Sequence, residues 1–279
     1  MHKVLKIIFF FRLIIVNPRL FFNKFIFKIK YYLAKKNYDE NKFIEDQETI
    51  YKKNGLNRNF GIQNFFNLSN KHSFLDNASS SEHQILLCAI STTRHFNNIL
   101  EIGTHDGSNS FLISKLFPNS KIDTLDLPDN DVTFRKIYGR QDYSKFKKLN
   151  ETRDKILKEN INISFIQENS VNLIKETKKY DLIWIDGAHG YPVVTIDIIN
   201  ALRLINKNGI ILCDDVWINK PIKQDKIYNS LASFETLKQL KDNNLINFDL
   251  FYKRLDVESN SFKYNRKYIA YIKKSYEYT

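Results

Sequence analysis

The stretch "YDLIWIDGAHGYPVVTIDIINALRLINKNGIILCDD", residues 180–215, alternates short apolar runs with one longer amphipathic run. Residues 180–186 and 209–215 are short and apolar, as buried strands are, whereas residues 193–205 have the length and periodicity of a helix. Strands that alternate with helices in this way indicate a parallel sheet covered on both faces. This stretch therefore predicts an α/β core.

The same alternation continues toward both ends of the chain. Further strands are expected at residues 98–103, 121–127 and 162–167, and further helices at 81–96, after Gly107, at 143–158 and at 229–242. Two closing strands, 246–252 and 267–272, have no helix between them and would form an antiparallel edge. We expect a Rossmann-like, doubly wound, mostly parallel seven-stranded sheet over residues 81–279. A helical, basic extension and linker over residues 1–80 would precede it.

Composition narrows the class of protein. The chain has 279 residues, 43% of them hydrophobic, and a net charge of +12, which suits one domain with a sizeable core plus an extension. Cys88 and Cys213 offer no disulfide framework, which favours a reducing, cytoplasmic compartment. The charge is spread along the chain and accompanies many Lys, Asn, Ile and Phe residues, a pattern that AT-rich coding produces. Nucleic acid is therefore not the favoured partner.

The first 36 residues contain nine Lys or Arg and no acidic residue. Their 13-residue apolar stretch, interrupted by Lys6 and Arg12, is too short and too charged to span a bilayer, which needs about 20 apolar residues. Pro18 is expected to separate two helices that carry aromatic, aliphatic and cationic side chains. Such helices can lie on the inner surface of a membrane, or pack on the main domain or on a second copy of the chain. The sequence leaves these alternatives open.

A first candidate site begins at "LEIGTHDGSNS", residues 100–110, at the end of an expected strand. Gly103 permits a tight turn and Gly107 permits a ligand to approach the next helix, while Glu101 suits a cationic ligand. Asp126 ends the next strand, 23 positions after Gly103, where a carboxylate can accept hydrogen bonds from two ribose hydroxyls. The spacing differs from the Gly-x-Gly-x-x-Gly of a dinucleotide-binding turn, which disfavours a dehydrogenase.

In this order, these residues resemble the donor site of class I S-adenosylmethionine-dependent methyltransferases. The resemblance implies that S-adenosylmethionine is the cofactor and that Gly103 and neighbouring amides, such as that of Thr104, lie near its methionine moiety. It also implies that Glu101 lies near the amino group and Asp126 on the ribose. The expected donor-binding residues are Glu101, Gly103, Thr104, Gly107, Asp126 and, near the adenine, Ser170.

A second candidate site lies at the ends of two later strands. Asp186 ends one of them, and Asp214 and Asp215 end the other, so three carboxylates would converge at one edge of the sheet. Their repulsion would be relieved by a divalent cation such as Mg²⁺, which prefers oxygen ligands. His189 could then take a proton from a bound hydroxyl. The alternative is that each acid caps a helix or pairs with a lysine.

The stretch from Asp186 to Asp215 resembles the methyltransferase domain family that includes metal-dependent sugar O-methyltransferases of macrolide biosynthesis and cephalosporin-biosynthesis proteins. The resemblance implies that Asp186, Asp214 and Asp215 bind the metal and that His189, beside Asp186, is the base. The chain departs from the family at Asn208, where a glycine is common. Residues 127–160 match nothing assignable, and the segments 127–145 and 217–228 are expected to form a lid.

The predicted function is methyl transfer from S-adenosylmethionine, with Mg²⁺, to a hydroxyl of a sugar or another small polar acceptor. Two alternatives stay open. A nucleic-acid methyltransferase would use the same donor site and the positive charge. A catalytically inert scaffold would use residues 1–36 to contact a membrane.

Overall fold

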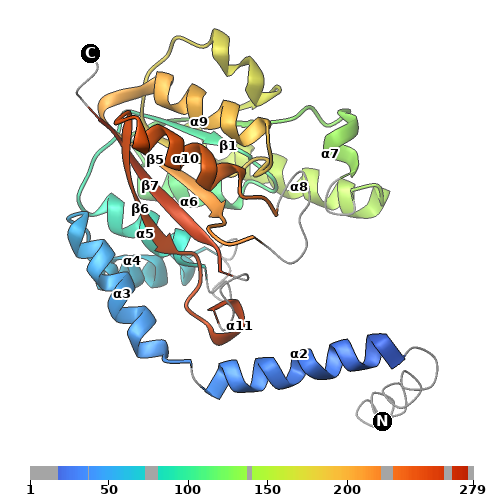
Figure 1. Cartoon of the computed structure of the whole chain (residues 1–279). Coiled ribbons are helices and arrows are strands. Elements are labelled where there is room, and N and C mark those ends of the chain that lie inside the picture. Colours follow the sequence, from blue (N-terminus) through green and yellow to red (C-terminus); the bar gives the residue numbers. More distant parts are fainter. Residues whose placement is uncertain are drawn as a thin grey trace.

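The computed structural model describes residues 18–36, 38–72, 81–136, 140–220, 229–260 and 266–275 (Figure 1). Its centre is a seven-stranded sheet in the order β3-β2-β1-β4-β5-β7-β6. The strands are β1 (Asn98–Ile102), β2 (Lys121–Asp126), β3 (Ile163–Gln167), β4 (Tyr180–Ile185), β5 (Ile205–Val216), β6 (Ile246–Tyr252) and β7 (Tyr268–Lys274). β1 to β5 pair in parallel, and β7 runs antiparallel to both of its neighbours. The expected mostly parallel sheet with an antiparallel edge is confirmed.

Helices cover both faces of the sheet, as Figure 1 shows. One face packs against α5 (Glu82–Ser91), α6 (Ser108–Leu116) and α8 (Tyr143–Glu159), and the other against η1 (Ser170–Lys175), α9 (Val193–Leu204) and α10 (Ala232–Asp242). Along β4, Leu182 and Trp184 join the first core, whereas Ile183 and Ile185 join the second. Successive side chains of a strand point to opposite faces. A strand buried on both faces must therefore be apolar throughout.

The segment expected as a linker contributes two helices to the core, α3 (Glu40–Lys53) and α4 (Arg58–Ser69). Tyr51 is fully buried, and its ring meets that of Phe251 in β6 at 5.0 Å. Gly61 lets α4 approach α5 closely, because a Cβ there would lie 2.5 Å from the carbonyl oxygen of Ile85. Residues 40–69 therefore share one core with the sheet, although their sequence is mostly polar.

The helix α2 (Pro18–Lys36) extends away from the rest of the described chain (Figure 1). It carries exposed apolar side chains at helical spacing: Phe22, Phe25, Ile26, Ile29, Tyr32 and Leu33. Among the described residues, no helix is both long and apolar enough to cross a membrane. Residues 1–17, the first part of the segment expected to contact a membrane, lie outside the described residues.

Candidate active site

An irregularity at the end of β5 directs two consecutive acids toward one partner. Cys213 pairs with Ala270 and Val216 with Tyr268, so β5 has one more residue than β7 between these pairs. Asp215 lies in this bulge with a positive φ of 53°. In a regular strand, Asp214 and Asp215 would point to opposite faces. The bulge removes this alternation, and both carboxylates reach the same ammonium group.

That ammonium group belongs to Lys253, the residue after β6. Its Nζ donates to Oδ2 of Asp214 at 2.5 Å and also to Oδ1 of Asp215. Lys267, the residue before β7, donates to the other oxygen of Asp215 at 2.5 Å. Burial alone would lower the pKa of Lys253, but the charges of Asp214 and Asp215 raise it above its ordinary value. The two lysines compensate the two acids.

Asp186 follows β4 and lies beside His189. Their Oδ1 and Nε2 atoms are 3.4 Å apart, and the side chain of Asp186 is 36% exposed whereas that of His189 is 3% exposed. Burial lowers the pKa of His189, but its hydrogen bond to the Asp186 carboxylate and the charge of Asp215 outweigh this effect, so the net pKa is raised. Asp186 is therefore partly exposed, whereas His189 is buried beside it.

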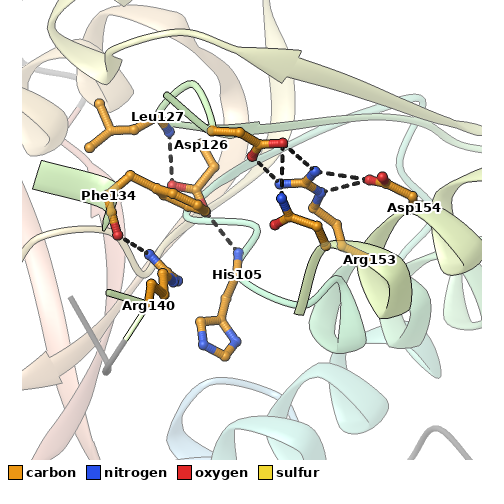
Figure 2. A network of polar contacts seen from close by, with 9 residues as sticks. His105, Asp126, Leu127, Phe134, Arg140, Arg153 and Asp154 are labelled. Atoms are coloured by element: carbon orange, nitrogen blue, oxygen red, sulfur yellow. Dashed lines mark hydrogen bonds and ion pairs between the residues drawn. The ribbon is translucent and has the colours of Figure 1, made fainter. Parts of the chain in front are cut away.

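The loop after β1 meets the end of β2 at Asp126, as Figure 2 shows. Oδ2 of Asp126 accepts a hydrogen bond from the backbone N–H of His105 at 2.9 Å, and Oδ1 accepts one from the backbone N–H of Leu127 at 2.8 Å. Each carboxylate oxygen retains a further lone pair for a ligand. Gly103 has a φ of 104°, and a Cβ there would lie 2.3 Å from the backbone oxygen of Asp186. Only glycine permits this approach of β1 to β4.

Glu101 lies inside the protein. It is fully buried, and Ser110, Thr124 at 2.5 Å and Asn109 at 2.8 Å all donate to its carboxylate. Burial raises the pKa of Glu101 to about 7, although these hydrogen bonds act in the opposite direction. Its carboxylate holds α6 against the sheet, and its predicted contact with the amino group of the donor stays a prediction.

The two groups of residues line one cavity of about 710 Å³ along the carboxyl edge of the sheet. Of the predicted site residues, it is lined by Gly103, Thr104, Asp126, Ser170, Asp186, His189 and Asp215. Glu101, Gly107 and Asp214 are not part of its lining. The volume lies in the usual range for a site that holds a small molecule or cofactor.

Residues after β2 form a wall of this cavity, which places part of the expected lid. Phe134 of α7 (Val132–Lys136) and Arg140 line it, and the guanidinium group of Arg140 stacks on the Phe134 ring at 3.9 Å. Figure 2 shows Arg153 nearby; it binds both oxygens of Asp129 and one of Asp154, which ties the segment after β2 to α8. Residues 137–139 and 221–228 lie outside the described part of the chain.

Comparison with known families identifies the type of domain to which this edge of the sheet belongs. Residues 100–216, from β1 to the end of β5, match the model of a methyltransferase domain family. This part of the chain is a methyltransferase domain. The match includes the predicted site residues from Glu101 to Asp215. A comparison with curated proteins finds no match.

Solved structures with related architecture include several methyltransferases. An O-methyltransferase of Streptomyces achromogenes involved in tomaymycin synthesis, in complex with SAM, is 14% identical over 68% of this chain and 78% of its own, with a TM-score of 0.47. The SAH-bound Podospora anserina methyltransferase PaMTH1 is 18% identical over 77% and 87%, with a TM-score of 0.48. A putative O-methyltransferase of Klebsiella pneumoniae is 15% identical over 89% and 96%, with a TM-score of 0.43. Such low identities do not transfer an acceptor to this methyltransferase.

Two of the three acids do not fit the predicted metal site as they stand, because lysines already pair with them. An ion between Asp214 and Asp215 would have to displace the ammonium group of Lys253, which already bonds to both. Oδ1 of Asp214 is buried without a hydrogen-bond partner in the described part of the chain, but Mg²⁺ needs an octahedral set of oxygens. Across the described ranges, no group of three or more His, Cys, Asp or Glu side chains could hold a metal ion. The ligand set Asp186, Asp214 and Asp215 therefore stays a prediction, and two of its three acids are paired with lysines.

Three residues at or near this site were missed from the sequence. Lys253 lies beyond the matched domain and is one of 43 Lys and Arg residues. His83, on α5, lines the cavity, and burial lowers its pKa to about 4. Asp197, on α9, is fully buried behind Gly187, and burial raises its pKa to about 7. An acid inside an apolar helix was the one visible sign of Asp197.

Proposed function

We propose that this methyltransferase transfers the methyl group of S-adenosylmethionine to a hydroxyl oxygen of a small polar acceptor, in the first instance a sugar. The supporting observation is that one cavity brings Gly103 and Asp126 together with the Asp186–His189 pair. The first two suit a donor that carries a ribose, and the pair suits an acceptor that must lose a proton. Ser170 also lines this cavity, and we assign it to the adenine.

The donor supplies an electrophilic methyl group on a positively charged sulfur when it is bound. The residues of the chain have three tasks: Asp126 orients the ribose, the cavity wall excludes water, and the Asp186–His189 pair accepts the hydroxyl proton. A C–O bond forms as the C–S bond breaks, and the C–S electron pair stays on sulfur. Orientation and proton removal supply the rate.

The Mg²⁺ dependence predicted from the sequence is not part of this proposal, since Lys253 already pairs with Asp214 and Asp215. The acceptor class rests on cavity size and on the hydroxyl chemistry that a carboxylate–histidine pair supports. A nucleic-acid acceptor is the competing outcome, and binding of tRNA that falls steeply with added salt would favour it.

The test is transfer of radiolabelled methyl from S-adenosylmethionine to nucleotide sugars and glycolipids. We expect His189→Gln and Asp186→Asn to lower turnover at least 100-fold while binding of S-adenosylhomocysteine, measured by calorimetry, changes little. His95→Gln is the matched control, because His95 is exposed and lies outside the cavity lining. Full turnover by both site variants would contradict the assigned proton acceptor.

We also propose that α2 contacts an anionic membrane surface. Ile26, Ile29 and Leu33 are exposed on one stripe, and the first 36 residues contain no acid to repel such a surface. Co-sedimentation with phosphatidylglycerol vesicles should exceed that with phosphatidylcholine vesicles, and Ile26→Glu with Ile29→Glu should abolish it. Monodisperse dimers that lose affinity for each other in this double variant would instead assign the stripe to a second copy of the chain.

A further inference from the structure

The carboxyl edge of the sheet balances its charge with residues of the chain itself. Asp214 and Asp215 contribute two negative charges, and Lys253 and Lys267 contribute two positive charges within hydrogen-bond distance. The side chains of Asp214 and Lys253 are only 2% and 14% exposed. Uncompensated carboxylates at such burial would cost several kcal/mol. The lysines compensate the carboxylate charges. The repulsion from which the sequence predicted a metal ion is therefore already relieved.

The geometry of the strands brings both lysines to this edge. β6 and β7 pair antiparallel with Tyr252 opposite Tyr268, and the backbone N–H of Lys253 donates to the carbonyl oxygen of Lys267 at 3.0 Å. The end of β6 and the start of β7 therefore lie beside the end of β5. Of the two lysines, Lys253 lines the cavity together with Asp186 and His189, whereas Lys267 does not.

An ammonium group has three N–H donors. Two of those on Lys253 go to Asp214 and Asp215, and among the described residues no third side-chain acceptor is recorded for its Nζ. One N–H is thus available to a ligand on the cavity side. A hydroxyl oxygen placed there would lie between a positive charge and the Asp186–His189 pair.

Building on the proposed function, we propose that Lys253 is a catalytic residue that binds the reacting oxygen of the acceptor in the position where the sequence predicted a divalent cation. Methyl transfer by this protein would then need no metal. Lys253 donates a hydrogen bond to the hydroxyl oxygen and stabilises negative charge on it as the proton leaves for the Asp186–His189 pair. The oxygen then attacks the methyl carbon, and the C–S electron pair remains on sulfur.

The first test uses Mn²⁺, whose free form gives an electron paramagnetic resonance signal that binding removes. With S-adenosylhomocysteine present, we expect the wild-type protein to bind no Mn²⁺ below 1 mM, because Lys253 holds the ion's place. Lys253→Met should bind at least 10-fold more tightly, since two carboxylates become available. Lys178→Met is the matched control, since Lys178 also bonds to a buried acid at 2.5 Å, but away from the cavity.

Tight Mn²⁺ binding by the wild-type protein would overturn the proposal, and so would equally weak binding by wild type and Lys253→Met. If Lys253→Met does not fold, as judged by circular dichroism, the wild-type titration still decides. Binding of S-adenosylhomocysteine distinguishes failure of the proposed function from failure of the Lys253 proposal. If the wild-type protein does not bind S-adenosylhomocysteine, the proposed function is contradicted. If it binds both S-adenosylhomocysteine and Mn²⁺ tightly, only the role of Lys253 is contradicted. With an acceptor identified, EDTA should leave wild-type turnover unchanged within 2-fold.

Discussion

Two lysine–aspartate ion pairs with the same Nζ–Oδ2 distance of 2.5 Å lie at opposite ends of the sheet. Lys178, two residues before β4, bonds to Asp123 at 2.5 Å, and the hydroxyl of Tyr180 donates to the same oxygen at 2.8 Å. Lys253 bonds to Asp214 at 2.5 Å and also to Asp215. The first group lies outside the cavity lining, whereas Lys253 and Asp215 line it. The contact alone does not distinguish a structural pair from a functional one; access to a cavity does.

The largest effect should come from removing each lysine in turn. Lys253→Met leaves two acids with 2% and 12% exposed side chains, so we expect a loss of about 3–5 kcal/mol in the free energy of unfolding at pH 7. Lys178→Met leaves one acid that keeps its Tyr180 hydrogen bond, so about 1–2 kcal/mol is expected. Urea denaturation without divalent ions measures both. Equal losses of stability in the two variants would contradict the expected difference between the two ion pairs.

A next smaller effect should come from the backbone that supports the open end. Gly103→Ala places a Cβ 2.3 Å from the backbone oxygen of Asp186 at a φ of 104°, and we expect a loss of about 3 kcal/mol. Gly187→Ala meets its nearest neighbour, Ile102, at 3.5 Å, and about 1 kcal/mol or less is expected. Thermal unfolding of the two variants provides the comparison, and a stable Gly103→Ala protein would contradict the described approach of β1 to β4.

Asp197 differs from the acids of both pairs because it is fully buried and burial raises its pKa to about 7, from 3.8. Between these values the native state keeps a proton that the unfolded chain has lost. The contribution of this group to stability is therefore highest below pH 3.8 and falls as the pH rises to 7, by about 4 kcal/mol. Asp197→Asn should reduce that slope in urea denaturation at pH 5 and pH 8. An unchanged slope would show that Asp197 ionises normally.

Among the lysine substitutions, the smallest effect is expected for Lys267→Met. Asp215 would keep its bond to Lys253, and the side chain of Lys267 is already 28% exposed, so a loss of about 1 kcal/mol is expected. This variant should resemble the wild-type protein in binding no Mn²⁺. A new Mn²⁺ site in Lys267→Met would mean that both lysines, not Lys253 alone, exclude the ion.

Much of the fold follows from local pattern. The alternation of apolar runs predicted all seven strands, because parallel strands buried on both faces must be apolar throughout. The same rule placed Asp126, Asp186 and Asp215 at one edge, where the structure brings them to one cavity. Strand alternation also explains Glu101, which points toward Ser110 of α6 and not into the cavity.

The remaining features depend on contacts between distant parts of the chain. Lys253 lies 38 positions after Asp215 on the antiparallel edge, and nothing in its neighbourhood marks it among many lysines. The bulge that turns Asp214 and Asp215 toward one partner is a property of pairing with β7. In α3, the buried residues are Gln47 and Tyr51 within a polar sequence, so its amphipathic face is narrow and resembles a linker.

The most direct test of the central claim, that this edge of the sheet holds S-adenosylmethionine, is calorimetric titration with the product S-adenosylhomocysteine. The account predicts micromolar binding by the wild-type protein. It also predicts at least a 10-fold loss in Asp126→Ala, since each hydrogen bond to a charged group contributes about 1.5–3 kcal/mol. Absence of binding by the folded wild-type protein, or binding that Asp126→Ala leaves unchanged, would contradict it.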